Sequence, residues 1–362
     1  MPHLVVSISG HGYGHVAQTA PILNHLYDRM PELRITVRTS VPFDYLRTRI
    51  RAPFDLLSSE GDIGMVMSSA LDVDVERSRA AYRDFHAGWD CRVAEEANLL
   101  CDLNADLVFS NVGYLPLAGA QRAGIPNVSL CSLNWVDIYQ HYCGEDSVSA
   151  QIYSCYADAD NFLRVTPGME MSDLPNLVSV SPIAEIGRNR RDELNRHLNV
   201  SDDVKLVLVS MGGIASRLPL EFWPRIEGVR WLVQENWQAD HPDAIALESL
   251  PLGFSDLLAS CDVLLCKPGY GSFVEAACSN VPVLFASRAD WPESSALVEW
   301  LKIHGRCLEV TRQVLEQGDV EAALNEIWQM PPGVQVVTDG AEQVAEWLMK
   351  KHEWSGNSRG IL

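Results

Sequence analysis

The sequence predicts an α/β protein of two domains, each built on a doubly wound parallel sheet. The chain has 362 residues, which exceeds the size at which one hydrophobic core keeps growing, so two domains are expected. Strand-like and helix-like segments alternate along both halves, which favours parallel sheets covered by helices. In each half the first strand runs directly into a glycine-rich turn, HLVVSISGHGYGH from residue 3 and VKLVLVSMGG from residue 204.

The first half begins with a β-branched segment that ends at the first glycine cluster. Strands are expected at residues 3–9, 34–39, 107–111 (LVFSN) and 127–132 (NVSLCS). Apolar residues at helical spacing predict helices at 15–29, 76–103 and 115–123. The stretch 41–75 is less regular.

The second half repeats this alternation. Strands are expected at 204–210, 229–234, 244–248, 262–266 (DVLLC) and 281–287 (VPVLFAS). Helices are expected at 253–260, 273–280, 294–304, 319–329 and 340–351. The sequence predicts an N-terminal domain at 1–165 and a C-terminal domain at 203–335, joined by a connection rich in Pro and Gly at 166–202. A C-terminal helix at 336–352 can pack back on the N-terminal domain, and a flexible tail follows at 353–362.

Composition excludes several classes of function. The formal net charge of −20 argues against a nucleic-acid partner and against a polybasic membrane-docking face. The N-terminus lacks a basic region and a cleavage site, and no apolar stretch approaches the length of a membrane span, so the sequence carries no strong membrane signal. The nine Cys form no C-x-x-C pair, which favours reduced thiols in a cytoplasmic protein. The oligomeric state is not predictable from these features.

The first glycine-rich turn, GHGYGH at 10–15, lies between the first strand and the first helix. Gly12 and Gly14 leave little side-chain bulk, so a ligand can approach the backbone and the helix N-terminus. The spacing is not the G-x-G-x-x-G dinucleotide fingerprint, because His15 stands where the third glycine is needed. His15 suits a general base or a substrate contact, and His11 is a second candidate; alternatively, both cap and pack the turn.

The second turn, KPGYGS at 267–272, also joins a strand to a helix. Its backbone amides, with Ser272, suit a phosphate oxygen. Glu275 follows Ser272 at capping-box spacing, so a helix cap and a carboxylate that accepts ribose hydroxyls are equally open.

Two further loops follow strands of the second half. Met211, Gly212 and Gly213 suit a loop that closes over a phosphate, although a plain strand-to-helix turn looks the same. In the segment RADWPESS at 288–295, Glu293 and Ser294 are candidates for contacts with sugar hydroxyls, the alternative being a solvated loop.

These segments together resemble the glycosyltransferase B superfamily, whose members have two facing Rossmann-like domains with a ligand cleft between them. The chain is similar to the N-terminal glycosyltransferase-like region of L-arabinokinase-type proteins, and also to the peptidoglycan N-acetylglucosaminyltransferase and UDP-glycosyltransferase families. The resemblance covers nearly the whole chain. The residues that carry it are SGHGYGHVAQ at 9–18, ADLVFSN at 105–111, AGIPNVSLCSLNW at 123–135 and CKPGYGSFVEAACSNVPVLFASRADWPE at 266–293.

The resemblance implies a glycosyltransferase that takes a sugar from a nucleotide-diphosphate donor, with UDP expected, and passes it to an unidentified acceptor. Glu275 would hold the ribose, Ser272 the diphosphate, and His15 the acceptor proton. The full set of implied nucleotide-sugar contacts is Gly12, Gly14, Met211, Gly212, Gly213, Leu252, Pro268, Gly269, Tyr270, Gly271, Ser272, Glu275, Asp290, Glu293 and Ser294. None of the segments that carry the resemblance contains a D-x-D motif, so neither a metal nor another cofactor is expected.

The chain departs from the family pattern at some points, so three functions stay open. Kinase activity is not expected, because these 362 residues include no sugar kinase domain. The arginine that faces the diphosphate in many relatives is not obvious, with Arg188 and Arg217 as weak candidates. Asp137 is an alternative base, and Tyr114, Trp135 and Tyr139 are candidates for stacking on an acceptor sugar. The alternatives to transfer are a nucleotide-sugar hydrolase or epimerase, and a binding module without catalysis.

Overall fold

A computed structural model describes residues 1–58, 62–69, 71–212, 217–288 and 290–351. The chain divides into two compact units. The first unit is made of Met1–Ser68, Val73–Ile183 and Thr338–Leu362, and the second of Ser69–Asp72 and Ala184–Val337. Each unit carries its own parallel sheet, in agreement with the predicted fold class.

The first unit is built on a seven-stranded parallel sheet with the order β3-β2-β1-β4-β5-β6-β7. Its strands are β1 (His3–Ile8), β2 (Arg34–Thr39), β3 (Asp55–Ser58), β4 (Leu107–Asn111), β5 (Asn127–Cys131), β6 (Asn161–Val165) and β7 (Leu177–Val180). Every residue of the central strands β1 and β4 is buried, which is typical of a sheet covered on both faces. The strand order reverses between β1 and β4, and open α/β sheets bind ligands at such a point.

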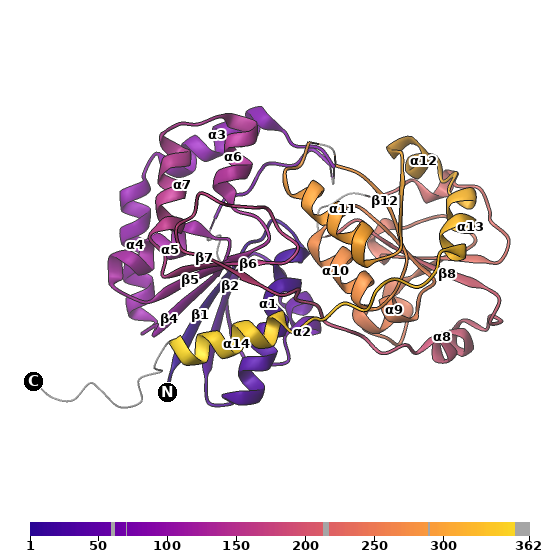
Figure 1. The fold of residues 1–362 in the computed structure, drawn as a ribbon, viewed down its shortest axis with the longest axis horizontal. Coiled ribbons are helices and arrows are strands. Elements are labelled where there is room, and N and C mark those ends of the chain that lie inside the picture. The colour runs from indigo at the N-terminus through magenta and orange to yellow at the C-terminus, as the bar shows by residue number, and fades with distance from the viewer. Residues whose placement is uncertain (59–61, 70, 213–216, 289, 352–362) are drawn as a thin grey trace, which may run out of the picture. The chain divides into compact units, whose positions relative to one another are not determined.

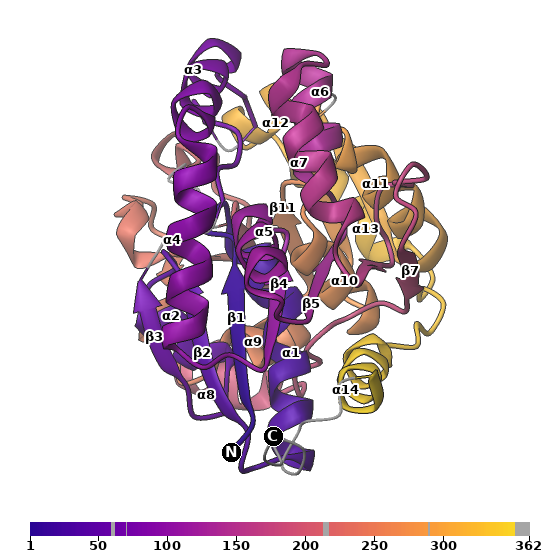
Figure 2. The ribbon, with the colours of Figure 1, turned by 90° about the vertical axis from the view of Figure 1, so that its left-hand side faces the viewer.

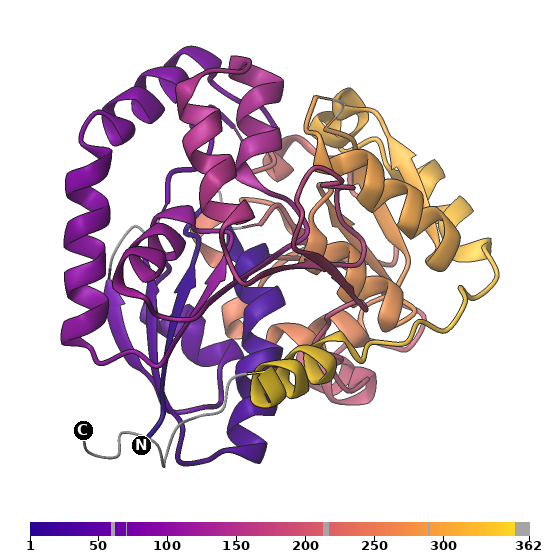
Figure 3. The same ribbon diagram turned by 60° about the vertical axis from the view of Figure 1, so that its left-hand side comes forward.

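Helices cover both faces of this sheet (Figure 1). Figure 2 shows α4 and α5 on one side of the strands and α1 on the other. Figure 3 shows the C-terminal helix α14 beside α1, and the Arg29 guanidinium pairs there with the carboxylate of Glu342. The helices of the unit are α1 (Tyr13–Arg29), α2 (Phe43–Arg49), α3 (Val75–His86), α4 (Trp89–Asp102), α5 (Tyr114–Ala123), α6 (Trp135–Cys143), α7 (Ser147–Ala157) and α14 (Gly340–Lys351).

The structure corrects the element prediction at several places. The single helix expected at 76–103 is wrong, because α3 ends at the cap residue Ala87 and α4 begins after Gly88. The irregular stretch 41–75 contains α2 and β3, and α6, α7, β6 and β7 were not predicted.

The second unit is built on a six-stranded parallel sheet with the order β10-β9-β8-β11-β12-β13. Its strands are β8 (Lys205–Ser210), β9 (Val229–Val233), β10 (Ala244–Ala246), β11 (Val263–Cys266), β12 (Val283–Ala286) and β13 (Cys307–Val310). Its α-helices are α8 (Arg191–Leu198), α9 (Phe254–Ser260), α10 (Tyr270–Cys278), α11 (Glu293–His304), α12 (Arg312–Gln317) and α13 (Glu321–Gln329), with 3-10 turns at Leu220–Phe222, Glu235–Trp237 and Leu247–Ser249.

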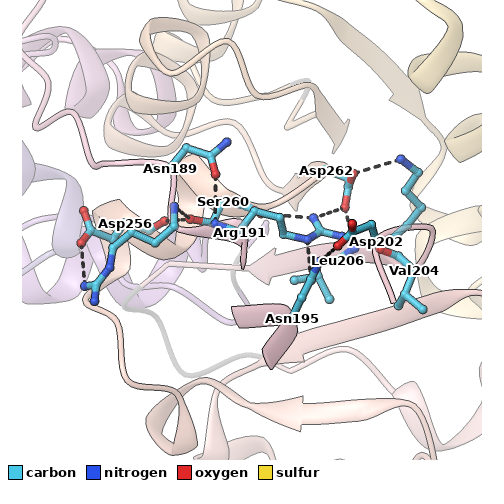
Figure 4. Close-up of polar contacts among 11 residues, drawn as sticks. Asn189, Arg191, Asn195, Asp202, Val204, Leu206, Asp256, Ser260 and Asp262 are labelled. Atoms are coloured by element: carbon cyan, nitrogen blue, oxygen red, sulfur yellow. Dashed lines mark hydrogen bonds and ion pairs between the residues drawn. The ribbon is translucent and has the colours of Figure 1, made fainter. Parts of the chain in front are cut away.

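A polar cluster ties α8 to the beginning of this sheet (Figure 4). The Arg191 guanidinium donates to Asp262 Oδ2 at 2.6 Å and to the carbonyl of Ser260 at 3.2 Å. The same Asp262 carboxylate accepts the backbone N–H of Leu206 at 2.8 Å and the ammonium of Lys205 at 3.1 Å. One half-buried carboxylate therefore joins α8 to the first residues of β8 and β11.

Within the described residues, no helix combines the length and the apolar character that a membrane span requires. All nine cysteines are free thiols.

Candidate functional site

Three loops of the second unit leave the carboxyl ends of neighbouring strands. Strands β8, β11 and β12 lie side by side and run parallel, so the residues after Ser210, Cys266 and Ala286 meet at one edge of the sheet. This edge is where open α/β sheets bind ligands. The loops that follow contain most of the nucleotide-sugar contacts proposed from the sequence.

The helix after β11 begins earlier than the capping interpretation requires. Its N-cap is Gly269, and no side chain caps its first turn. Ser272 therefore lies inside the helix, and the capping-box interpretation of Ser272 and Glu275 is wrong. Glu275 is only 2% exposed. The pKa of the neighbouring Cys278 thiol is raised, mainly by burial of the thiol and secondly by the negative charge of Glu275. Glu275 is therefore a buried carboxylate beside the ligand edge of the sheet and not a helix cap.

The turn after β8 closely approaches the residue that follows β11. Gly212 has a φ of 80°, a backbone conformation that favours glycine. A Cβ atom there would stand 3.2 Å from Cε of Lys267. The Met211 side chain belongs to the hydrophobic core, so only its backbone can face a ligand. Gly213 lies outside the described residues.

Two cationic side chains lie at this edge, a half-buried Lys267 and a buried Arg288. Burial, together with the nearby charge of Arg288 and against that of Glu293, lowers the pKa of Lys267 to about 8. Arg288 is 5% exposed, and its guanidinium stands 4.2 Å from the ring centroid of Trp291. Two cations therefore share this edge with the carboxylates of Glu275 and Glu293. Lys and Arg side chains at such an edge suit an anionic ligand.

The loop after β12 presents the remaining candidates. The Trp291 indole donates to Glu293 Oε2 at 3.2 Å, and this bond fixes the carboxylate. Asp290 is exposed. Ser294 is buried, and its hydroxyl has no hydrogen-bond partner among the described residues. Most buried hydroxyls are bonded, so this one suits a ligand. Of the other proposed contacts, Leu252, Pro268, Tyr270 and Gly271 are buried and Gly269 is half-buried.

The first glycine-rich turn lies at the strand-order reversal of the first unit. A Cβ at Gly12 or Gly14 would meet no atom within 4 Å, so packing does not require these glycines. No side chain caps α1, which begins at Tyr13. His11 contacts the Trp135 ring edge-on, with the ring centroids 5.0 Å apart. The open space beside this turn leaves room for a ligand.

His15 is buried in the first turn of α1 and is 7% exposed. Its Nδ1 lies 2.8 Å from Oδ1 of Asn111, the last residue of β4. Burial lowers the pKa of His15 to about 4, against the raising effect of the Asn111 hydrogen bond. The imidazole is therefore neutral at pH 7, and a neutral imidazole can accept a proton.

The remaining acceptor-side candidates lie elsewhere in the first unit. The Asp137 carboxylate lines a cavity of about 580 Å³ between α6, α7 and the loop 169–174. Burial, opposed by a hydrogen bond from Asn134, raises the pKa of Asp137. Tyr114, Trp135 and Tyr139 are fully buried, so their rings are core packing rather than exposed stacking surfaces.

The structure adds residues that sequence reasoning missed. Lys267 and Arg288 were quoted only as parts of motifs, and Asn111 only as the end of LVFSN. The weak arginine candidates have other roles or positions: Arg217 is held by the carboxylate of Glu221 and the carbonyl of Trp237, and Arg188 is exposed. A cation directly after an apolar strand was the available indication for Lys267.

Comparison with known sequences finds one distant relative and no matching family model. The chain is 24% identical over 366 residues to an L-arabinokinase of Arabidopsis thaliana. That alignment covers 96% of this chain but 34% of the relative, so the chain spans about a third of its length.

Solved structures share the fold along nearly the whole chain. A glycotransferase of kitacinnamycin superposes with a TM-score of 0.60 at 16% identity, covering 97% of this chain and 100% of that one. The Arabidopsis thaliana protein UGT89C1 in complex with UDP has a TM-score of 0.55 at 15% identity, covering 99% and 97%. A putative UDP-N-acetylglucosamine 2-epimerase of Listeria monocytogenes has a TM-score of 0.55 at 12% identity, covering 96% of each chain.

Proposed function

We propose that this chain, whose fold is that of the glycosyltransferase B superfamily, transfers a sugar from a nucleotide-diphosphate donor to an acceptor that is not yet identified. The observation that carries the proposal is the pair of cations, half-buried Lys267 and buried Arg288, at the edge where β8, β11 and β12 end. A diphosphate is the anion that this pair suits. UDP is the expected nucleotide, because neighbours of this fold are complexes with UDP.

The other groups of this edge fit the rest of such a donor. Two backbone features, the turn at Gly212 and the uncapped first turn of α10, can donate N–H groups to phosphate oxygens. The carboxylate of Glu275 suits the ribose hydroxyls, since a carboxylate accepts two hydrogen bonds. Glu293 and the hydroxyl of Ser294 suit the hydroxyls of the sugar.

The proposed reaction exchanges one bond at the anomeric carbon of the sugar. The acceptor oxygen forms a bond to this carbon as the bond to the diphosphate oxygen breaks. The acceptor proton moves to Nε2 of His15, and the electron pair of the broken bond leaves with the diphosphate. Lys267 and Arg288 stabilise the charge that develops on the leaving group. No step requires a metal ion, so transfer should continue in the presence of EDTA.

Thermal unfolding of the full chain with UDP, GDP, dTDP, CDP and their common sugars tests the donor site. A ligand present at about 100 times its dissociation constant should add about 2.7 kcal/mol of stability. E275Q should lose most of this gain, because one of the two acceptor oxygens becomes an NH2 donor and the negative charge that strengthens both hydrogen bonds is lost. E299Q, an exposed position on α11, is the matched control and should keep it. An equal gain in E275Q and E299Q would remove Glu275 from the donor site.

A second candidate function is epimerisation or hydrolysis of the nucleotide-sugar. The structural likeness to a putative 2-epimerase supports this candidate. Incubation of the protein with the nucleotide-sugar that it binds, without any acceptor, separates the two candidate functions. Formation of a free sugar or an epimer would contradict transfer, and an unchanged donor would favour transfer.

A further inference from the structure

We propose that Asn111 is a positioning residue that fixes one tautomer of His15, with the proton on Nδ1 and the lone pair on Nε2. The tautomer is inferred from hydrogen bonds alone. Only the role of the Nε2 lone pair, to receive the acceptor proton, rests on the proposed function. The inference follows from the hydrogen bonds of a buried polar network that joins the beginning of α1 to the ends of β4 and β5. Its members are His15, Gln18, Thr19, Asn111 and Ser132, and all five are buried.

The backbone of α1 determines which way the Asn111 amide points. Nδ2 of Asn111 lies 3.2 Å from the carbonyl oxygen of His15, which can only accept a hydrogen bond. The group that faces this carbonyl must therefore be the NH2. The hydroxyl of Thr19 donates to the same carbonyl at 2.9 Å, so its lone pairs remain to accept from Nδ2 of Asn111 at 3.0 Å. A flipped amide would direct its oxygen at the carbonyl and lose both bonds.

The amide orientation in turn determines the proton of the ring. With the NH2 directed at α1, Oδ1 of Asn111 is the atom that faces Nδ1 of His15 at 2.8 Å. An amide oxygen can only accept, so Nδ1 must carry the proton. A neutral imidazole has one N–H, which leaves Nε2 unprotonated. Gln18 supports the arrangement, because its Oε1 accepts from Asn111 Nδ2 at 3.1 Å while its Nε2 donates to Ser132 at 2.7 Å.

The groups around the ring also keep it neutral. Three side chains contact the ring, from Asn111 on β4, Cys131 on β5 and Trp135 on α6. The Cys131 sulfur lies 3.7 Å from Nδ1, and the centroid of the Trp135 ring lies 6.4 Å from that of the imidazole. These are an amide, a thiol and an indole, and none of them is a carboxylate. The Asp62 carboxylate accepts the indole N–H of Trp135 at 2.6 Å. The amide thus orients the ring without supplying the negative charge that would stabilise an imidazolium.

Nitrogen NMR of the unliganded full chain tests the tautomer directly. Long-range proton–nitrogen correlation spectra at pH 7 distinguish a protonated from an unprotonated ring nitrogen, and H15Q identifies the His15 signals by their loss. The expected result is a protonated Nδ1 and an unprotonated Nε2. An unprotonated Nδ1, or protons on both nitrogens, would overturn the inference. The measurement needs neither nucleotide nor acceptor, so it remains decisive even if the proposed function fails.

The variant N111D tests whether Asn111 is the cause. A carboxylate in contact with Nδ1 should raise the pKa of His15 by about one to three units. N24D makes the same change at another buried asparagine of the unit, which bonds the backbone of Arg49 and Arg51, and should leave that pKa unchanged. Under the proposed function, N111D also moves the acid limb of the transfer pH profile upward. An unshifted His15 pKa in folded N111D contradicts the role, and the wild-type spectrum decides the question if N111D does not fold.

Discussion

Replacement of Lys267 by methionine should stabilise the unliganded protein and weaken its binding of a nucleotide diphosphate. Methionine has a similar length and shape but no charge. Removal of an ammonium from water disfavours its charged form, and the lowered pKa of Lys267 measures this cost. A residue that serves only stability would show the opposite sign, because its removal would destabilise the fold.

The magnitude follows from the pKa. Lys267 falls from an ordinary value of 10.5 to about 8 in the folded chain. At pH 7 the ammonium is charged in both the folded and the unfolded state, so the full difference counts, which is about 3 kcal/mol at 1.36 kcal/mol per pKa unit. Above pH 8 the folded state loses the proton first, so wild-type stability rises with pH relative to the variant. At pH 9.5 the difference should fall to about 1.4 kcal/mol.

Urea unfolding of wild type, K267M and K302M at pH 7 and pH 9.5 measures both effects. Lys302 is exposed on α11, so K302M should match wild type at each pH. A gain in K267M that approaches 3 kcal/mol at pH 7 and shrinks at pH 9.5 would support the account. A K267M protein that is less stable than K302M at pH 7 would refute it, because Lys267 would then be a structural cation.

Three further predictions concern the frame that holds the site. Between pH 6.5 and pH 4, wild type should lose about 3 kcal/mol more stability than H15Q, because the unfolded chain binds the His15 proton first; parallel pH curves would disprove this. D262N should lower the free energy of unfolding by about 2 to 3 kcal/mol, because it weakens the hydrogen bonds to Arg191 and Lys205. D319N, at an exposed site, should leave the free energy of unfolding unchanged, and chemical denaturation compares the two variants. G187A should lower the free energy of unfolding by about 2 kcal/mol, because its Cβ would stand 2.0 Å from the carbonyl oxygen of Ser255. G253A, whose Cβ would meet no atom within 4 Å, is the control, and a similar thermal midpoint for the two variants would count against this prediction.

The sequence was sufficient for the fold class because each half begins with a buried strand that ends in glycines. In a parallel sheet such strands read as continuous apolar runs, and VKLVLVS and HLVVSIS are clear examples. The break between α3 and α4 was missed because a single glycine inside a helical pattern is tolerated at about 1 kcal/mol. Gly88 therefore resembles a tolerated interior residue until the structure places it at the N-cap of α4.

The candidate site was only partly predictable for a different reason. Motif spacing indicated the loop at 267–275, but the charge environment of Lys267 and Arg288 depends on which loops meet at the sheet edge. That meeting is set by the order of β8, β11 and β12, which the sequence does not state. Asn111 was missed on similar grounds, since its role depends on His15, 96 residues earlier, and a polar residue at a strand end has no distinctive pattern.

Isothermal titration calorimetry of the full chain with UDP and UDP-sugars at pH 7 tests the donor site most directly, with K267M and K302M beside wild type. The account predicts that a nucleotide diphosphate or its sugar binds wild type and K302M equally, and binds K267M at least about tenfold more weakly, which corresponds to about 1.4 kcal/mol. Equal affinity in K267M, or no binding to wild type by any nucleotide diphosphate or nucleotide-sugar, would contradict it.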